Sequence, residues 1–105
     1  MKHLPFPDMP GVIAGSENNS DLFIRSVTFE TGYCEETLHN HPNTYEFYII
    51  LSGQLTFENG RSQQILAKAN SIVHFDEAEP HRIVNVDETT SMLLIKRLGA
   101  EKVIE

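Results

Sequence analysis

A chain of 105 residues, 40% of them hydrophobic and 22% charged, has the length of one globular domain and no room for a second catalytic domain. Fifteen acidic residues against eight basic ones give a formal net charge of −7, which repels phosphate backbones and anionic lipid surfaces, so we expect neither nucleic acid nor a membrane as a partner. No apolar run has the length of a transmembrane helix and no segment resembles a signal peptide, so a cytoplasmic location is expected.

The first 20 residues are expected to form an extended N-terminal arm, followed by a single domain at residues 21–105. The residues that exclude a regular helix from the arm are Pro5, Pro7, Pro10 and Gly11. Such an arm could be disordered, or it could lie across a partner subunit.

Runs of β-branched and aromatic residues, separated by turn signals at intervals of about ten residues, predict about eight short strands and no helix. The expected strands lie at residues 22–29, 33–41, 46–51, 55–58, 61–66, 71–75, 82–86 and 91–98. Turns are expected at residues 52–54 and 87–89, and Asn59-Gly60 is typical of a type I′ hairpin turn. The pattern predicts an all-β barrel or sandwich.

Two histidines and a glutamate stand close together at the start of the apolar run at residues 46–51. On an extended chain His39 and His41 project to the same side, about 7 Å apart, where they can share one ion. Glu46 follows a turn-like break, and His81 is available downstream. Three imidazoles and one carboxylate suit a divalent transition metal (iron, manganese, nickel or zinc) and leave coordination positions open. The alternative is that the histidines are ordinary surface residues.

The alternation of side chains along a strand places further residues near this site. It puts Tyr48 on the same face as Glu46, which makes Tyr48 the candidate catalytic residue that contacts a substrate. Tyr48 could instead be a core aromatic whose hydroxyl is satisfied by hydrogen bonding. Counted from His81, the same alternation directs Ile83 and Asn85 inward.

Cys34 is the only cysteine, so it cannot form an intramolecular disulfide, which agrees with a reducing compartment. A redox or metal-ligand role is conceivable for it. A buried, small hydrophobic side chain is the favoured interpretation.

These motifs resemble those of the cupin family. Its first motif has two histidines one residue apart, a glutamate three or four residues on, and a glycine after six more; the matching residues are His39, His41, Glu46 and Gly53. His81 and Asn85 match the end of its second motif, whose upstream glycine, proline and glycine are replaced here. The replacing residues are Asn70, Asp76 and Ala78. The resemblance implies a double-stranded β-helix, a jelly-roll barrel with the metal inside.

Similar small cupins include dioxygenases, isomerases, lyases and decarboxylases as well as proteins that only bind ligands. We expect a metal-dependent enzyme that acts on a small oxygen-bearing metabolite, with dioxygenase-like chemistry ahead of isomerase or lyase chemistry. The alternative is a non-catalytic module that binds a sugar or another small molecule. No organic cofactor is expected, because the chain has no glycine-rich phosphate loop. A homodimer is expected, because the apolar strand at residues 46–51 has two faces to cover.

Overall fold

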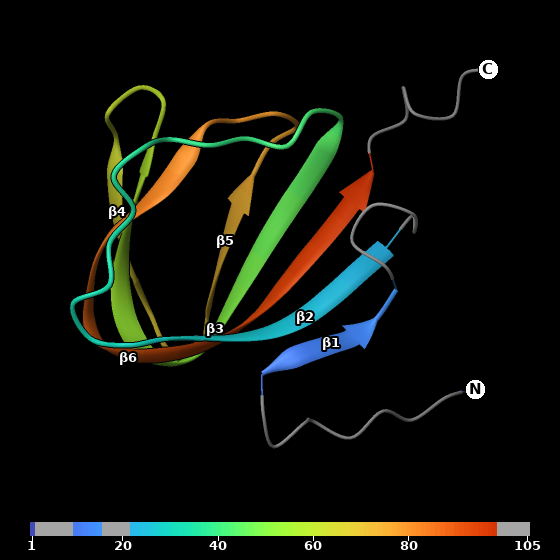
Figure 1. Cartoon of the computed structure of the whole chain (residues 1–105), viewed down its shortest axis with the longest axis horizontal. Helices are drawn as coiled ribbons and strands as arrows, with labels where there is room; N and C mark the ends of the chain where they lie inside the picture. Colours follow the sequence, from blue (N-terminus) through green and yellow to red (C-terminus); the bar gives the residue numbers. More distant parts are fainter. Residues whose placement is uncertain (2–9, 16–21, 99–105) are drawn as a thin grey trace.

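The computed structural model describes residues 1, 10–15 and 22–98, and every regular element in them is a β-strand. The strands are β1 (Gly11–Ala14), β2 (Leu22–Phe29), β3 (Thr44–Asn59), β4 (Gln64–Lys68), β5 (Ser71–Phe75) and β6 (His81–Leu98). They form one antiparallel sheet that curls into a barrel (Figure 1). The prediction of an all-β barrel is therefore confirmed. Within these ranges no helix is long and apolar enough to cross a membrane.

The two long strands β3 and β6 form the centre of the barrel and pair with each other from Thr44↔Leu98 to Asn59↔His81. On its other edge β3 pairs first with β5 and then with β4. The C-terminal half of β6 pairs with β2, and β1 follows at the sheet edge. Because both long strands bend, each contributes to two opposed sides of the barrel, which is the arrangement of a double-stranded β-helix (Figure 1).

The predicted turns at residues 52–54 and 87–89 are bends inside continuous strands, so four of the predicted short strands form the two long strands β3 and β6. The register between β3 and β6 shifts around Ser52 and Gln54. Gly53 has a φ of 89°, and the Thr90 hydroxyl accepts a hydrogen bond of 3.0 Å from the Gln54 amide. The bulge therefore turns the chain without ending the strand, since it keeps a backbone donor satisfied.

The β3–β4 hairpin lies where Asn59-Gly60 predicts it, but its turn is not type I′. Within this loop, the positive φ falls on Ser62 (62°) and not on Asn59 or Gly60. The Asn59 side-chain oxygen accepts hydrogen bonds from the amides of Arg61 (3.0 Å) and Gln63 (3.1 Å). This side-chain capping stabilises a longer loop than the two-residue turn.

Residues 33–41 were predicted to form a strand but run beside β6 with only separate contacts. His39 forms an isolated bridge to His81, with backbone N···O distances of 3.0 and 2.9 Å. The Glu35 amide donates to the Ile83 carbonyl at 2.8 Å. Cys34 is exposed, so the expectation of a buried, small hydrophobic side chain is wrong. An irregular segment at the surface has no regular inward face on which to place that thiol.

Part of the expected N-terminal arm is a strand. β1 pairs antiparallel with β2, with Gly11 opposite Ser26 and Val12 opposite Arg25. The remaining residues of the arm, 2–9 and 16–20, lie outside the described residues. The boundary between arm and domain at residue 20 stays a prediction.

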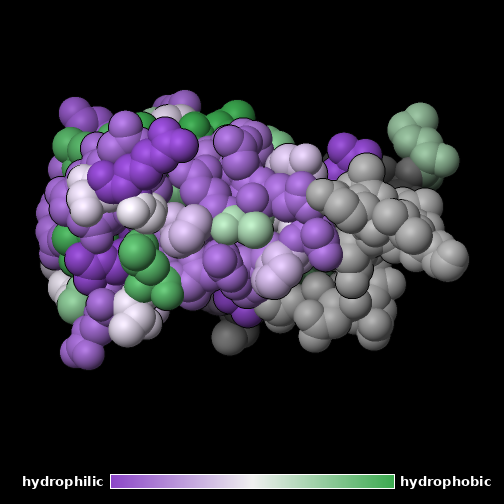
Figure 2. Space-filling view, turned by 90° about the horizontal axis from the view of Figure 1, so that it is seen from above, coloured by the Kyte–Doolittle hydropathy of each residue, from purple (hydrophilic) through white to green (hydrophobic). Residues whose placement is uncertain are grey.

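The core lies inside the barrel and is contributed mainly by β3 and β6. Its most deeply buried apolar side chains are Ile50, Leu55, Phe57, Val86 and Met92. Seen from above, the molecular surface is mainly hydrophilic (Figure 2). Because polar side chains normally lie at such a surface, the polar residues that are buried inside the barrel need a specific explanation.

Candidate metal centre

The four predicted ligands come from three separate segments that the fold brings together. His39 and His41 lie in the irregular segment before β3, Glu46 is near the start of β3, and His81 is the first residue of β6. The isolated bridge pairs His39 with His81, and their ring centroids are 4.5 Å apart. The centroids of His39 and His41 are 5.8 Å apart. The three imidazoles therefore form one cluster.

Glu46 lies at the centre of this cluster. Its Oε2 is 3.6 Å from His41 Nε2, and its Oε1 is 3.5 Å from His81 Nε2. The Tyr48 hydroxyl donates a hydrogen bond of 3.0 Å to Oε1 of Glu46. Glu46 is only 2% exposed and His81 only 1% exposed. A carboxylate at this depth requires compensating donors or cations, and the cluster supplies them.

The orientation of His81 is set by two neighbours. Its Nδ1 lies 2.8 Å from the Glu79 carbonyl oxygen, and because a carbonyl can only accept, Nδ1 carries the proton that is donated. The Phe75 ring stacks on the imidazole with centroids 4.1 Å apart. The remaining nitrogen, Nε2, is buried without a hydrogen-bond partner. In its neutral form, an imidazole held this way presents a lone pair at Nε2, and metal-binding histidines are oriented by second-shell contacts of the same kind.

The cluster changes the pKa values of its members. Burial opposes ionisation of Glu46, but the close imidazoles of His81 and His41, together with the hydrogen bond from Tyr48, lower the pKa of Glu46 overall. Burial also opposes protonation of His81, yet the Glu46 carboxylate beside Nε2 and the hydrogen bond to the Glu79 carbonyl raise its pKa. For His41 burial outweighs the attraction of Glu46 and lowers the pKa. Burial and the negative charge of Glu46 raise the pKa of Tyr48, so its phenol stays protonated.

A cavity of about 180 Å³ opens beside this cluster. Its wall includes His39, His41, Glu46 and Tyr48, and the apolar side chains of Val27, Phe29 and Leu94 lie around them. Arg25 and Lys96 also line it. These two cations were missed in the sequence. Lys96 could have been found there, since it continues the inward alternation of Met92 and Leu94 with a charge.

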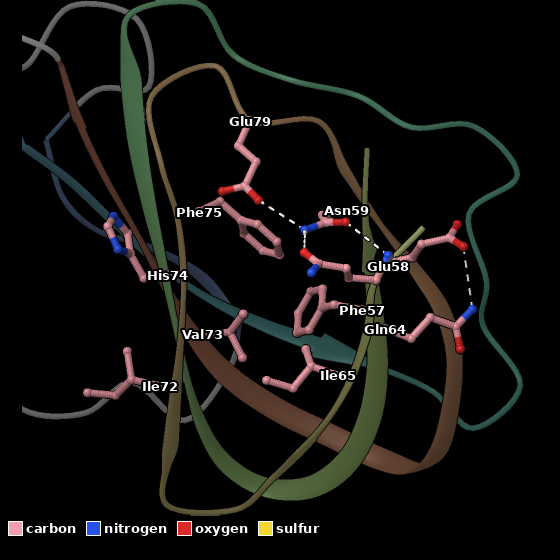
Figure 3. Close-up of a pocket in the computed structure, with 11 residues that line it drawn as sticks. Phe57, Glu58, Asn59, Gln64, Ile65, Ile72, Val73, His74, Phe75 and Glu79 are labelled. Atoms are coloured by element: carbon pink, nitrogen blue, oxygen red, sulfur yellow. Dashed lines mark hydrogen bonds between the residues drawn. The ribbon is translucent and has the colours of Figure 1, made fainter. Parts of the chain in front are cut away.

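A larger pocket of about 360 Å³ lies elsewhere, at the opening between β4 and β5 (Figure 3). Its apolar lining includes Phe57, Ile65 and Val73, and the Asn59 and Glu79 side chains lie at its edge. None of the four predicted ligands lines it. Phe75 lines this pocket and also stacks on His81, so this ring lies between the pocket and the histidine cluster. The chemistry of the lining, and not its volume, therefore distinguishes the candidate site.

Tyr48 is 7% exposed and its hydroxyl is bonded to Glu46, as the core alternative predicted, and it also lines the cavity. Its contact with a substrate stays a prediction. Ile83 is buried as predicted, but Asn85 is exposed, and its predicted inward orientation is wrong. The register shifts between Thr56 and Phe57, which pair with Asn85 and Ile83. This bulge reverses the alternation beyond Ile83, and Val86 is buried instead.

The donor set can be compared with the needs of a metal ion. Imidazole nitrogens and a carboxylate are ligands of divalent transition metals, and the unpartnered His81 Nε2 fits such a role. Bonds of about 2.1 Å place neighbouring ligand atoms roughly 3.0–3.4 Å apart, slightly closer than the 3.5 and 3.6 Å seen here. In the ranges that the structure describes, no three His, Cys, Asp or Glu side chains form a complete metal-binding cluster. The donors thus fit a metal in kind, while in their present arrangement the Glu46 oxygens lie 3.5 and 3.6 Å from the histidine nitrogens.

Comparison with solved structures supports the fold. Similar structures include the cupin domain of Cnp3 from Schizosaccharomyces pombe (TM-score 0.75, 11% identity, 89% of this chain and 66% of that chain). A DMSP lyase, DddQ, from Ruegeria pomeroyi matches with a TM-score of 0.73 and 23% identity over 89% of this chain and 48% of that chain. An RmlC-like cupin family protein with a double-stranded β-helix fold from Methanocaldococcus jannaschii matches with a TM-score of 0.74 and 17% identity, over 98% and 95% of the two chains.

The chain spans less than two thirds of the first two of these proteins, and identities this low show the fold alone. A comparison with curated protein sequences finds no match. A family model for the cupin domain matches residues 25–96, which include all four predicted ligands. The chain belongs to the cupin family.

Proposed function

We propose that this cupin is a metal-dependent enzyme acting on a small oxygen-bearing metabolite. The ligands would be His39, His41, Glu46 and His81, and the metal a divalent iron, manganese, nickel or zinc ion. The observation that carries the proposal is the buried His81 Nε2, which has no hydrogen-bond partner and faces a carboxylate of lowered pKa. Two further imidazoles gather around that pair.

When bound, such an ion would supply Lewis acidity and open positions for a substrate oxygen. The chain's own residues would orient the site: Glu79 and Phe75 hold the His81 ring, and Tyr48 holds Oε1 of Glu46. Tyr48 also lines the cavity, which makes its hydroxyl our candidate for contact with a substrate. We place dioxygenase-like chemistry ahead of isomerase or lyase chemistry, and the similar DMSP lyase from Ruegeria pomeroyi keeps lyase chemistry under consideration.

Elemental analysis tests the metal half of this proposal. Untagged protein purified without chelators should contain a near-stoichiometric transition metal, and the His41→Ala variant should have lost it. His74→Ala is the matched control, because His74 stacks on Phe47 and lies outside the cluster. Iron would make dioxygen uptake the next assay, whereas zinc, nickel or manganese would direct the search to isomerase or lyase reactions. No metal in the wild-type protein, and none taken up on reconstitution, would overturn the proposal.

A non-catalytic module for a sugar or another small molecule is the second candidate. Glu46 already accepts a hydrogen bond from Tyr48 and faces two imidazoles, so the cluster can be held together without an ion. Turnover of a candidate substrate that disappears in Glu46→Ala would favour the enzyme. Saturable binding without turnover across a broad substrate panel would favour the module.

We also propose a homodimer that buries the outer face of the sheet around β3. Phe47 and Ile49 are half-buried there, and Ile49 pairs with Ile72, which is 65% exposed. An apolar sheet face of this kind is typically covered by a second subunit. Sedimentation at micromolar concentration should show a dimer for the wild-type protein and for Leu66→Lys, and a monomer for Ile72→Lys. A wild-type monomer would contradict the proposal.

A small molecule is the proposed partner, and not nucleic acid or a membrane. The net charge of −7 disfavours binding to polyanions. The single cysteine agrees with a reducing compartment such as the cytoplasm. No organic cofactor is part of the proposal.

A further inference from the structure

We propose that the cavity binds a small organic acid and that Arg25 and Lys96 hold its carboxylate beside the metal ligands. The substrate class thereby becomes a short carboxylic acid with a second oxygen that can reach the metal. This inference rests on the proposed metal site for the second oxygen and for part of the positive charge, whereas the contacts of Arg25 and Lys96 with the carboxylate need no metal. The two halves can therefore be tested separately.

The strand registers place the two cations on the wall of the site. Lys96 on β6 pairs directly with Glu46 on β3. Arg25 on β2 pairs with Leu94, which pairs in turn with Tyr48. Because cross-strand partners project to the same face of a sheet, all of these side chains face the same cavity, whose lining contains every one of them.

The burial of Lys96 is the second observation. Lys96 is only 7% exposed, whereas lysine is among the residues that are least often buried. Apolar neighbours such as Val27, Phe29 and Leu94 exclude water and strengthen the field of any charge there.

The charge balance of the cavity favours an anion. Its acidic lining residues are Glu35 and Glu46. The Glu35 carboxylate is already engaged, since it accepts hydrogen bonds from the Ile83 amide (2.7 Å) and from the Tyr33 hydroxyl (3.0 Å). Glu46 would be a metal ligand. With a divalent ion in place, Arg25 and Lys96 leave the site with a net positive charge, in a chain that is strongly acidic as a whole.

The volume limits the size of the acid. About 180 Å³ corresponds to roughly six water molecules at their share of the liquid volume. Lactate has six non-hydrogen atoms that are covalently linked and so occupy less volume than six separate waters, and it therefore fits within this cavity. Arginine and lysine both bind carboxylates through charge-assisted hydrogen bonds, the arginine through two parallel donors.

Calorimetric titration with L-lactate and with L-lactamide tests the inference, because the two probes have nearly the same shape and differ in charge. Zinc-loaded wild-type protein should bind lactate about tenfold or more tightly than lactamide. Lys96→Met and Arg25→Met should each lose that preference while keeping their zinc. Lys96→Arg should keep it. The matched control is Arg97→Met, which removes the same charge from the next, exposed position of β6 and should leave the preference unchanged.

The outcomes separate this inference from the proposed metal site. Failure of the wild-type protein to bind zinc or any other transition metal overturns the metal site, and lactate titration of the same metal-free protein then still tests Arg25 and Lys96. Equal affinity for lactate and lactamide overturns the carboxylate site, as does an unchanged preference in Lys96→Met. No saturable binding of lactate at millimolar concentrations also overturns it. Circular dichroism of each variant shows whether a loss of binding reflects a loss of folding.

Discussion

Glu46 and His81 belong to opposite ends of the paired strands β3 and β6, yet Oε1 of Glu46 lies 3.5 Å from Nε2 of His81. Glu46 pairs with Lys96 near one end of this ladder, and His81 pairs with Asn59 at the other end. The two side chains meet only because both strands bend and the sheet curls into a barrel (Figure 1). Any change that loosens the bends should therefore disturb the site as well as the fold.

The first prediction concerns the carboxylate. Glu46→Gln keeps the shape of the side chain but removes the charge that would neutralise a cation, so we expect metal affinity to fall by more than about 10–100-fold, the usual loss for an outer-shell partner. Competition with a chromophoric chelator measures the affinity. Glu36→Gln, at an exposed position before the cluster, is the control and should bind metal like the wild-type protein. Equal metal binding by Glu46→Gln would show that Glu46 is not a ligand.

The second prediction concerns pH and applies to chelator-treated protein. The raised pKa of His81 contributes stability that is fully present below the ordinary value of 6.5 and is lost as the pH rises through the raised value. The lowered pKa of Glu46 contributes stability that is present above 4.5 and is lost as the pH falls through the lowered value. The lowered pKa of His41 changes the stability with pH in the opposite direction to the raised pKa of His81. The His41→Ala variant removes this opposing effect and leaves the contribution of Glu46 and His81.

In metal-free His41→Ala, the free energy of unfolding should therefore decrease as the pH rises from 6.5 into the alkaline range. Denaturant unfolding at several pH values measures this decrease. His41→Ala/His81→Gln is the control and should show a smaller slope. A free energy that rises over this range in the single variant would contradict the raised pKa of His81.

The third prediction tests the bend at Gly53. A Cβ at this position would lie 2.6 Å from Thr90 Oγ1 and 2.7 Å from Thr90 Cα, and the φ of 89° disfavours any L side chain. Gly53→Ala should cost more than about 2 kcal/mol of unfolding free energy, since the clash adds to a backbone penalty of about 1–2 kcal/mol. Gly32→Ala shares the positive φ but meets nothing within 4 Å, so it should cost only the backbone penalty. Equal costs in urea unfolding would rule out the clash.

The fourth prediction concerns the stacking of Phe75 on His81. Phe75 is 5% exposed and stacks on His81, so Phe75→Ala should destabilise the protein by about 3–5 kcal/mol and weaken metal binding by freeing the imidazole. Ile65→Ala, in the same pocket (Figure 3) but 54% exposed, should cost less than about 1 kcal/mol and leave metal binding unchanged. Thermal unfolding and metal titration of both variants test this pair. Unchanged metal affinity in folded Phe75→Ala would show that the stacking does not position His81.

The parts of the fold and the candidate site that could be predicted from the sequence depend on local patterns. Strand alternation placed Tyr48 on the same face as Glu46, and both are buried there. The strand at residues 71–75 has the predicted bounds. The spacing of His39 and His41 predicted neighbouring rings, and their centroids are 5.8 Å apart. Such features require only the geometry of a few consecutive residues.

The features that could not be predicted from the sequence depend on pairing between distant segments of the chain. A bulge opposite β3 turned Asn85 to the surface, and the lack of regular pairing around Cys34 left its thiol exposed. Curling of the sheet brought Arg25 and Lys96 to the wall of a cavity that also contains Glu46. The alternation of side chains can be read from each strand alone. One extra residue in a β-ladder, however, reverses the facing of all the following side chains of that strand, and pairing with the partner strand sets the position of this residue.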